Sequence, residues 1–245
     1  MKLLVMSNLS NMKETSAIDK PVKYGCEFCK REFLKESTTL RHICESKRRW
    51  LDKDNHGNRI AFQCWLDFYK KNSAGRKNRT QEEFIRSAYY VAFVKFGNYC
   101  VSINAINIPQ YIDWLLKNQI KIDNWCSDST YTKYLIEYLR HEDPFDAIHR
   151  SVENCIKMAE DANIQPHDML RYGNANKICY AITTGKISPW LLYQSASGTR
   201  FLDTLNEGQV RLVMDYIDPE QWAIKFKRDT DVTKRVNTTL KDAGY

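Results

Sequence analysis

Apolar residues recur at three- and four-residue spacing along most of the chain. The segment 59–69 carries one such stripe, made of Phe62, Trp65, Leu66 and Tyr69. This spacing puts the apolar side chains on one face of an α-helix, so it predicts a helix with a buried face. Further apolar segments of the same kind lie at 111–116, 131–139, 147–159, 169–182, 210–217 and 232–240. We expect each of them to be helical as well.

Prolines and capping residues mark the starts of these segments. Proline has a fixed φ and no N–H, so it is tolerated best in the first turn of a helix. Thr80 and Glu83 have the spacing of a capping box, and the apolar pattern continues behind them through Ala92. Five prolines stand at or near expected helix starts, namely Pro109, Pro144, Pro166, Pro189 and Pro219.

Strand-like runs are scarce by comparison. The best of them, at 99–103, could equally finish a helix. A small hairpin is expected only in the cysteine-containing segment 21–50. The sequence therefore predicts a mainly α protein.

Four residues of the kinds that bind zinc lie close together in that segment: Cys26, Cys29, His42 and Cys44. Two residues separate the first two cysteines, and twelve separate Cys29 from His42, as in many zinc sites. Thiolate and neutral imidazole suit a borderline-soft ion with tetrahedral geometry, and a unit this small needs a metal in order to fold. We predict one structural Zn²⁺ bound by all four residues. The alternative is a reduced thiol pair beside an unrelated histidine.

The same segment resembles the ββα zinc finger. The resemblance rests on the cysteine knuckle, on Phe33 four residues after Cys29, and on the position of His42. One departure concerns the core, because Thr39 stands where the family has a large apolar residue and Leu40 follows it. The resemblance implies a small zinc finger and covers only that segment, while the apolar spacing behind it predicts a multi-helix domain.

A second departure concerns the last two ligands. Only Ile43 separates His42 from Cys44, whereas the family has three to five residues at this place. Residues two apart on a helix point to nearly opposite sides, so we expect the chain to leave the helix at about His42. These features indicate a variant finger of the Cys-Cys-His-Cys type.

Positive charge is concentrated in the first third of the chain. The formal net charge is +7, and residues 1–80 hold 18 Lys and Arg against 9 Asp and Glu. Lys and Arg at this density neutralise phosphates without base-specific geometry, so we expect this part to meet DNA or RNA. A solvated charged linker is the alternative. The candidate nucleic-acid-binding residues are Lys47, Arg48, Arg49, Trp50, Lys70, Lys71, Arg76, Lys77 and Arg79.

Two features of this chain have more than one interpretation. Trp50 could stack on an unpaired base, as aromatic residues do in single-strand binders, but we favour packing on the helical domain. The segment 187–205 predicts two short helices around a Ser/Gly turn, which could form a helix-turn-helix. Any helical hairpin looks similar, and the acidic balance of residues 81–245 argues against contact with phosphates.

These observations divide the chain into a flexible leader at 1–20, a zinc finger at 21–50, a basic helix and loop at 51–80 and a helical domain at 81–245. No stretch has the apolar length of a membrane span or of a signal peptide, so we expect no membrane contact. Reduced, buried thiols are expected for the cysteines that lie singly in apolar segments, namely Cys64, Cys100, Cys126, Cys155 and Cys179.

Taken together, the finger, the segment Lys47–Trp50 and the segment 187–198 are similar to zinc-finger proteins that recur in T-even-type tailed bacteriophages. This resemblance extends over most of residues 22–245. It implies a protein made in the cytoplasm of an infected bacterium, or carried in the virion, and it implies no particular activity.

An enzyme is not the leading expectation. The histidines other than His42 stand without companion motifs, and there is no phosphate-binding Gly-rich loop. Our leading hypothesis is a non-enzymatic phage accessory protein that binds nucleic acid through the finger and the basic segment. Its helical domain would contact a replication, transcription or repair protein. The alternatives are a protein-interaction factor (a virion component or a host-directed adaptor), and a cryptic metal-dependent nuclease built from scattered carboxylates.

Overall fold

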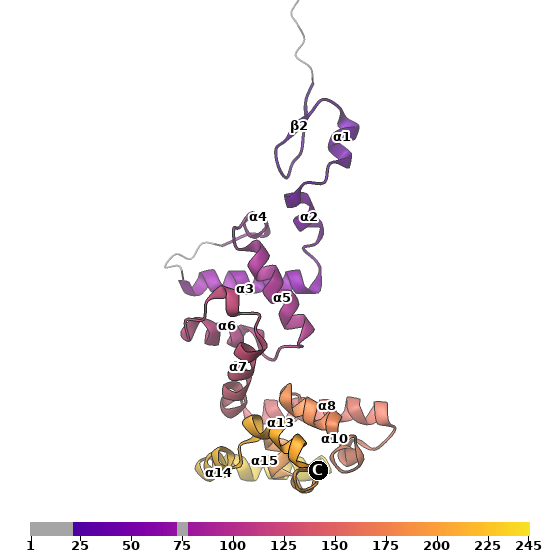
Figure 1. The fold of residues 1–245 in the computed structure, drawn as a ribbon, viewed down its shortest axis with the longest axis vertical. Coiled ribbons are helices and arrows are strands. Elements are labelled where there is room, and N and C mark those ends of the chain that lie inside the picture. Colours follow the sequence, from indigo (N-terminus) through magenta and orange to yellow (C-terminus); the bar gives the residue numbers. More distant parts are fainter. Residues whose placement is uncertain (1–21, 73–77) are drawn as a thin grey trace, which may run out of the picture. The chain divides into compact units, whose positions relative to one another are not determined.

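The computed structural model describes residues 22–72 and 78–245, and it groups the chain into two compact units. The first unit ends at Lys53 and the second begins at Asp54. The described residues are mainly helical, which confirms the fold class expected from the apolar spacing (Figure 1). None of the helices in the described residues combines the length and the apolar character needed to cross a membrane.

The first unit contains a short hairpin and two short helices. Strands β1 and β2 pair in antiparallel fashion, with Tyr24 opposite Phe33. Because each strand has only two residues, this hairpin needs other contacts to hold it. The elements are β1 (Tyr24–Gly25), β2 (Glu32–Phe33), α1 (Glu36–Arg41) and α2 (Glu45–Leu51).

The second unit is entirely helical over its described residues. Most helices expected from the sequence are present, and the strand-like run at 99–103 ends a helix. The α-helices are α3 (His56–Asn72), α4 (Gln81–Ile85), α5 (Tyr90–Ser102), α6 (Ile108–Lys117), α7 (Asp128–His141), α8 (Pro144–Ala162), α9 (Met169–Tyr172), α10 (Ala175–Thr183), α11 (Pro189–Gln194), α12 (Ala196–Asp203), α13 (Glu207–Ile217), α14 (Pro219–Arg228) and α15 (Thr230–Asp242). Two 3₁₀ turns, η1 (Ile122–Asn124) and η2 (Pro166–Asp168), complete the unit.

Two predicted helices are broken in the structure, and a local side-chain hydrogen bond lies at each break. The helix expected over 169–182 stops at Tyr172, and Asn174 accepts hydrogen bonds from the first N–H groups of α10. The helix expected from Thr80 through Ala92 also breaks, because the hydroxyl of Ser87 accepts the N–H of Tyr89 just before α5. Local side-chain hydrogen bonds thus override the continuous apolar pattern.

Helices α3 and α5 cross at small residues. A Cβ on Gly97 would lie 2.2 Å from the carbonyl oxygen of Gly57 and 3.1 Å from the Cβ of Ala61. Only glycine allows the two backbones to approach so closely. Beyond the crossing, Phe96 of α5 packs on the buried Trp125 at a centroid distance of 5.3 Å. The stripe on α3 therefore belongs to the core of the helical unit.

Helix α11 forms the buried centre of the C-terminal helices. Its residues Trp190, Leu191 and Leu192 are fully buried, and α8, α12 and α15 all contact it. Trp190 packs edge-on against Trp222 of α14, with 5.9 Å between ring centroids. Such aromatic pairs add to the stabilisation that burial itself provides.

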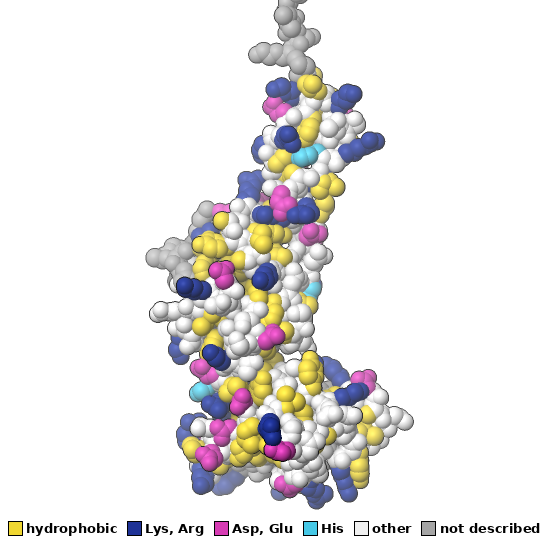
Figure 2. Space-filling view, in the orientation of Figure 1, with side chains coloured by type: hydrophobic (Ala, Val, Ile, Leu, Met, Phe, Trp, Pro, Cys, Tyr) yellow, Lys and Arg dark blue, Asp and Glu magenta, His cyan; other side chains and the backbone are white. Residues whose placement is uncertain are grey.

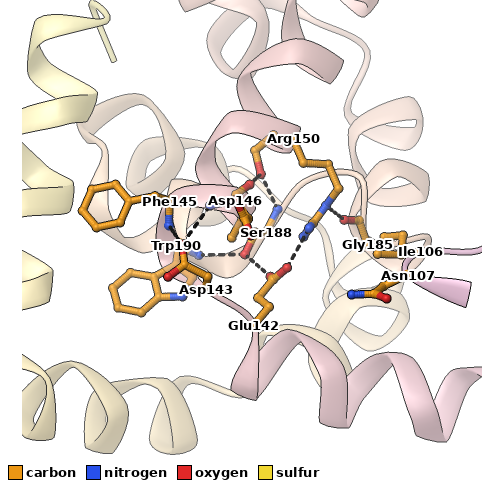
Figure 3. Close-up of polar contacts among 12 residues, drawn as sticks. Ile106, Asn107, Glu142, Asp143, Phe145, Asp146, Arg150, Gly185, Ser188 and Trp190 are labelled. Atoms are coloured by element: carbon orange, nitrogen blue, oxygen red, sulfur yellow. Dashed lines mark hydrogen bonds and ion pairs between the residues drawn. The ribbon is translucent and has the colours of Figure 1, made fainter. Parts of the chain in front are cut away.

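A buried ion pair joins the end of α7 to α8, and its hydrogen bonds extend to the segment before α11 (Figure 3). A guanidinium nitrogen of Arg150 lies 2.6 Å from a carboxylate oxygen of Glu142, whose side chain is 1% exposed. Ser188 donates a hydrogen bond to the other carboxylate oxygen at 3.0 Å, and Arg150 donates to the carbonyl of Gly185 at 2.8 Å. Burial raises the pKa of Glu142, although Arg150 acts to lower it. The carboxylate therefore depends on its partner to remain charged.

Replacing Arg150 with methionine is expected to destabilise the helical unit by about 3–5 kcal/mol at neutral pH, because Glu142 is left charged and unpaired. A raised pKa means that the folded state binds the proton more tightly than the unfolded state, so stability is lost as pH rises above the unfolded value. The loss should therefore be smaller at about pH 5 than at about pH 7.5. Urea unfolding followed by circular dichroism measures both.

The matched control is the double variant Arg150→Met with Glu142→Gln. It removes the unpaired charge, so it should regain part of the lost stability and show little pH dependence over this range. An Arg150→Met protein as stable as the unchanged protein at neutral pH would contradict the role assigned to this pair.

Candidate metal centre

The four predicted ligands come together in the first unit. Their ligand atoms all lie within 4.8 Å of one another. The sulfur atoms of Cys26 and Cys44 are 3.9 Å apart, and the sulfur of Cys29 is 3.3 Å from Nε2 of His42. Sulfur atoms bound tetrahedrally to zinc at about 2.3 Å lie about 3.8 Å from each other. The cluster therefore has the size that one metal ion requires.

The hairpin turn positions the first two cysteines. The N–H of Cys26 donates to the carbonyl of Arg31 at 2.9 Å, and the N–H of Lys30 donates to the carbonyl of Cys26 at 2.8 Å. Lys30 adopts a left-handed conformation with φ of 61°, which tightens the turn. This local geometry turns both sulfur atoms toward the same point, as expected for a cysteine knuckle.

The sulfur atoms affect one another's protonation. The backbone N–H of Cys29 lowers the pKa of Cys26, since it stabilises the thiolate. The N–H of Arg31 acts in the same direction on Cys29, but burial and the neighbouring sulfur atoms of Cys26 and Cys44 outweigh it and raise the pKa of Cys29. Several thiolates this close repel one another, so a cation at their centre is needed to hold them all ionised.

The last two ligands are separated by a change in backbone direction. Helix α1 ends at Arg41, and His42 is extended, with φ of −68° and ψ of 120°. This confirms the expectation that the chain leaves the helix at His42. Cys44 then caps α2, and its sulfur accepts the N–H of Lys47 at 3.4 Å. One residue is therefore both a candidate metal ligand and the N-cap of the next helix.

The finger has a small core that differs from that of the ββα family. Phe33 packs on the ring of His42, with centroids 4.8 Å apart. Thr39 takes the place of the usual large apolar residue, and its hydroxyl donates to the carbonyl of Tyr24 at 3.2 Å. Leu40 does not replace it, because its side chain is 71% exposed. The unit therefore buries little apolar surface, and a metal bound by the four candidate ligands would be its main source of order.

Helix α2 carries three of the predicted cationic residues. Arg48 and Arg49 both pair with Glu45 one turn earlier, Arg49 at 3.0 Å. The ammonium of Lys47 lies 3.4 Å from the carbonyl of Leu40, near the end of α1. The Arg48 side chain is 65% exposed, so its pair with Glu45 contributes little to stability and can exchange for another partner at low cost, whereas the Arg49 side chain is only 20% exposed.

Trp50 packs inside the first unit. Its ring lies 6.2 Å from that of Phe28 in the cysteine knuckle, and the ammonium of Lys53 sits 4.9 Å from its centroid. The two interpretations of Trp50 from the sequence, base stacking and packing on the helical domain, did not predict this contact with Phe28. Trp50 thus connects α2 to the metal-binding turn.

The other predicted cationic residues belong to the second unit or lie outside the described residues. Lys70 is exposed at the end of α3, and Lys71 forms an ion pair with Asp113. The guanidinium of Arg79 stacks over Tyr69 at 3.8 Å. Structural contacts within the helical unit therefore engage Lys71 and Arg79. Arg76 and Lys77 fall in the segment that the structure does not describe.

A hollow of about 290 Å³ lies beside His42, one of the four candidate metal ligands, and the sequence did not predict it. Its wall includes Ser37, Thr38 and Arg41 from one face of α1, together with Phe33. These residues carry hydroxyl and guanidinium donors next to the metal centre. The sequence could have indicated this hollow only through the spacing of these residues along a short helix. One arginine among neutral residues does not form a recognisable charged motif.

The segment 187–205 forms two helices, as predicted, with Ser195 between them. The hydroxyl of Ser195 accepts the N–H of Gly198 at 3.0 Å and starts α12. A Cβ on Gly198 would lie 2.5 Å from the carbonyl oxygen of Leu192, so the helices meet closely. The first of them is buried, which fits a role in the core.

The isolated cysteines behave largely as expected. All are free, and Cys64, Cys100, Cys155 and Cys179 are buried, while Cys126 is half-buried. Burial raises the pKa of Cys155 to about 11. Buried thiols of this kind pack as small apolar side chains and react slowly.

Comparison with known proteins gives no relative from which a role could be transferred. No protein-family model matches the chain, and no curated protein or solved structure is significantly similar to it.

Proposed function

We propose that the chain is a non-enzymatic accessory protein of a T-even-type tailed bacteriophage, acting in the cytoplasm of the infected bacterium. Its finger binds one structural Zn²⁺, and the finger and basic segment bind DNA or RNA. The helical unit contacts a replication, transcription or repair protein. The phage setting rests on the similarity of the finger, the segment Lys47–Trp50 and the segment 187–198 to phage zinc-finger proteins.

Zinc is the metal that suits this donor set. Three thiolates and one imidazole form a soft, tetrahedral environment, which favours zinc over hard, oxygen-seeking ions such as magnesium. All four protein ligands are present, so no position is left open for substrate, and the metal supplies folding energy rather than catalysis.

The observation that carries the proposal is the double role of Cys44. The residue is a candidate metal ligand and also the N-cap of α2, the helix that bears Lys47, Arg48 and Arg49. A metal bound at the cluster would therefore fix the start of a cationic helix. Figure 2 shows Lys and Arg side chains spread over the finger. Cations held on a rigid frame lose less entropy when they meet phosphates than cations on a free linker.

A protein-interaction role for the finger is the second candidate. Leu34, Leu40 and Ile43 are 70%, 71% and 67% exposed, although large apolar residues in a small unit are usually buried. Such side chains would suit an apolar partner surface. Binding of nucleic acid at low salt distinguishes the two candidates.

The purified protein is expected to carry one zinc per chain, and Cys26→Ser or Cys29→Ser should release it and unfold mainly residues 22–53. Elemental analysis measures the metal, and circular dichroism measures the helices. Cys126→Ser is the matched control, because this cysteine lies in the helical unit and outside the cluster. Protein purified without chelators but free of zinc would contradict the assignment, as would loss of all helical signal on chelation.

Reversing Lys47, Arg48 and Arg49 to Glu should weaken nucleic-acid binding strongly, and each phosphate contact removed should lower the salt-dependence slope by about 1. Fluorescence anisotropy with single-stranded DNA, double-stranded DNA and RNA across a salt series measures both. The matched control reverses three exposed lysines of the helical unit, Lys133, Lys157 and Lys227. If both triple variants bind alike, or if no nucleic acid binds at low salt, the protein-interaction role replaces this proposal.

Trp50→Ala should lower the melting temperature of the first unit and its resistance to chelators, because it removes the contact with Phe28. Affinity for single-stranded ligands should stay unchanged while the metal remains bound. Trp50→Phe, which keeps an aromatic ring against Phe28, should behave nearly as the unchanged protein. A loss of affinity confined to single strands, with unchanged melting, would instead show that the ring stacks on bases.

A further inference from the structure

A cavity of about 230 Å³ opens in the helical unit between the end of α7 and α14. Arg140 and His141 of α7 line one side, and Trp222, Lys225 and Arg228 of α14 line the other. Figure 1 shows α14 close to the C-terminal end of α7. Three cationic side chains thus face one small space, and no carboxylate of the described residues lines it.

Lys225 holds its charge in a partly apolar setting. Its ammonium donates to the carbonyl of Arg140 at 2.7 Å and lies 5.4 Å and 5.7 Å from the ring centroids of Trp190 and Trp222. Within the described residues it has no ion pair with a carboxylate. Burial lowers the pKa of Lys225, and the charge of Arg228 adds to this effect, while Asp229 opposes it. Its charge is only partly compensated.

The two arginines are also incompletely neutralised. Arg140 lies 3.8 Å from Asp218, a distance too long for a hydrogen bond, and Asp218 uses its other oxygen to cap α14. Arg228 makes two hydrogen bonds to Asp229, at 3.0 Å and 3.2 Å, from a side chain that is 69% exposed. The nearby Glu142 is already paired with Arg150. Asp218 and Asp229 are thus the two carboxylates near the three cationic side chains, and neither lines the cavity. The cavity therefore has an excess of positive charge.

We propose that this cavity binds a phosphomonoester group. A terminal phosphate has three oxygens and nearly two negative charges, so it can accept from both guanidinium groups and from the ammonium together. The cavity is smaller than those that enclose drug-sized ligands, so the phosphate enters and the rest of the ligand stays outside. Ile224, which is 63% exposed at the rim, offers that organic part an apolar contact.

Two sources present this group, a free nucleoside monophosphate and the phosphorylated end of a polynucleotide. Both carry the same terminal phosphate on a sugar, and the cavity recognises that shared part. The site lies in the helical unit, so it does not depend on nucleic-acid binding by the finger. Changes in the finger should leave it intact.

The test is isothermal titration calorimetry of the full, metal-loaded chain with inorganic phosphate and with AMP. Arg140→Gln and Arg228→Gln should each weaken binding by at least about tenfold, as expected for loss of one charge-assisted hydrogen bond. Lys227→Gln is the matched control, because Lys227 carries the same charge on the same helix but does not line the cavity, and its affinity should not change. Thermal melting checks that each variant remains folded.

A competition arm identifies the source. If a 5′-phosphorylated oligonucleotide displaces AMP better than the same oligonucleotide with a 5′-hydroxyl, the site accepts polymer ends. If the two oligonucleotides displace AMP equally, the site takes the free nucleotide. Both results support the proposed phosphate site. The proposal is overturned if neither phosphate nor AMP binds at millimolar concentration, if all variants bind alike, or if acetate binds as tightly as phosphate.

Discussion

The geometry of the finger is governed by the requirement that four side chains reach one point although two of them are only two residues apart. A continuous helix would send His42 and Cys44 to opposite sides. The structure meets the requirement by ending α1 before His42 and starting α2 after Cys44. The short hairpin, the exposed Leu40 and the contact between Trp50 and Phe28 all follow from a unit organised around its ligands rather than around apolar burial.

The cationic residues of the chain fall into two classes. Some have structural partners, such as Lys71 with Asp113 and Arg79 over Tyr69. Others, such as Arg140 and Lys225, have no carboxylate of the described residues within hydrogen-bonding distance. Net charge and local charge therefore give different information. The acidic balance of residues 81–245 did not indicate that part of the helical unit presents a positive cavity.

The sequence allowed prediction of whatever depends on local spacing. The four ligands, the departure of the chain from the helix at His42 and most helix positions belong to this class. The helix breaks at Gly173 and Ser87 could not be predicted in this way. Local side-chain hydrogen bonds interrupt the helices there although the apolar stripe continues. The cavity at Lys225 was also beyond reach, since it joins residues 85 positions apart and only tertiary packing brings them together.

The position of Cys44 at the start of α2 also couples two equilibria. A helix of seven residues is too short to persist alone in water, so the order of α2 depends on its anchor in the metal cluster. Thermodynamic linkage then makes the coupling reciprocal: any partner that requires a folded α2 must strengthen metal binding by the same factor by which the metal strengthens binding of that partner. A metal bound at the cluster and a partner bound to α2 would thus both stabilise the same folded state of this helix.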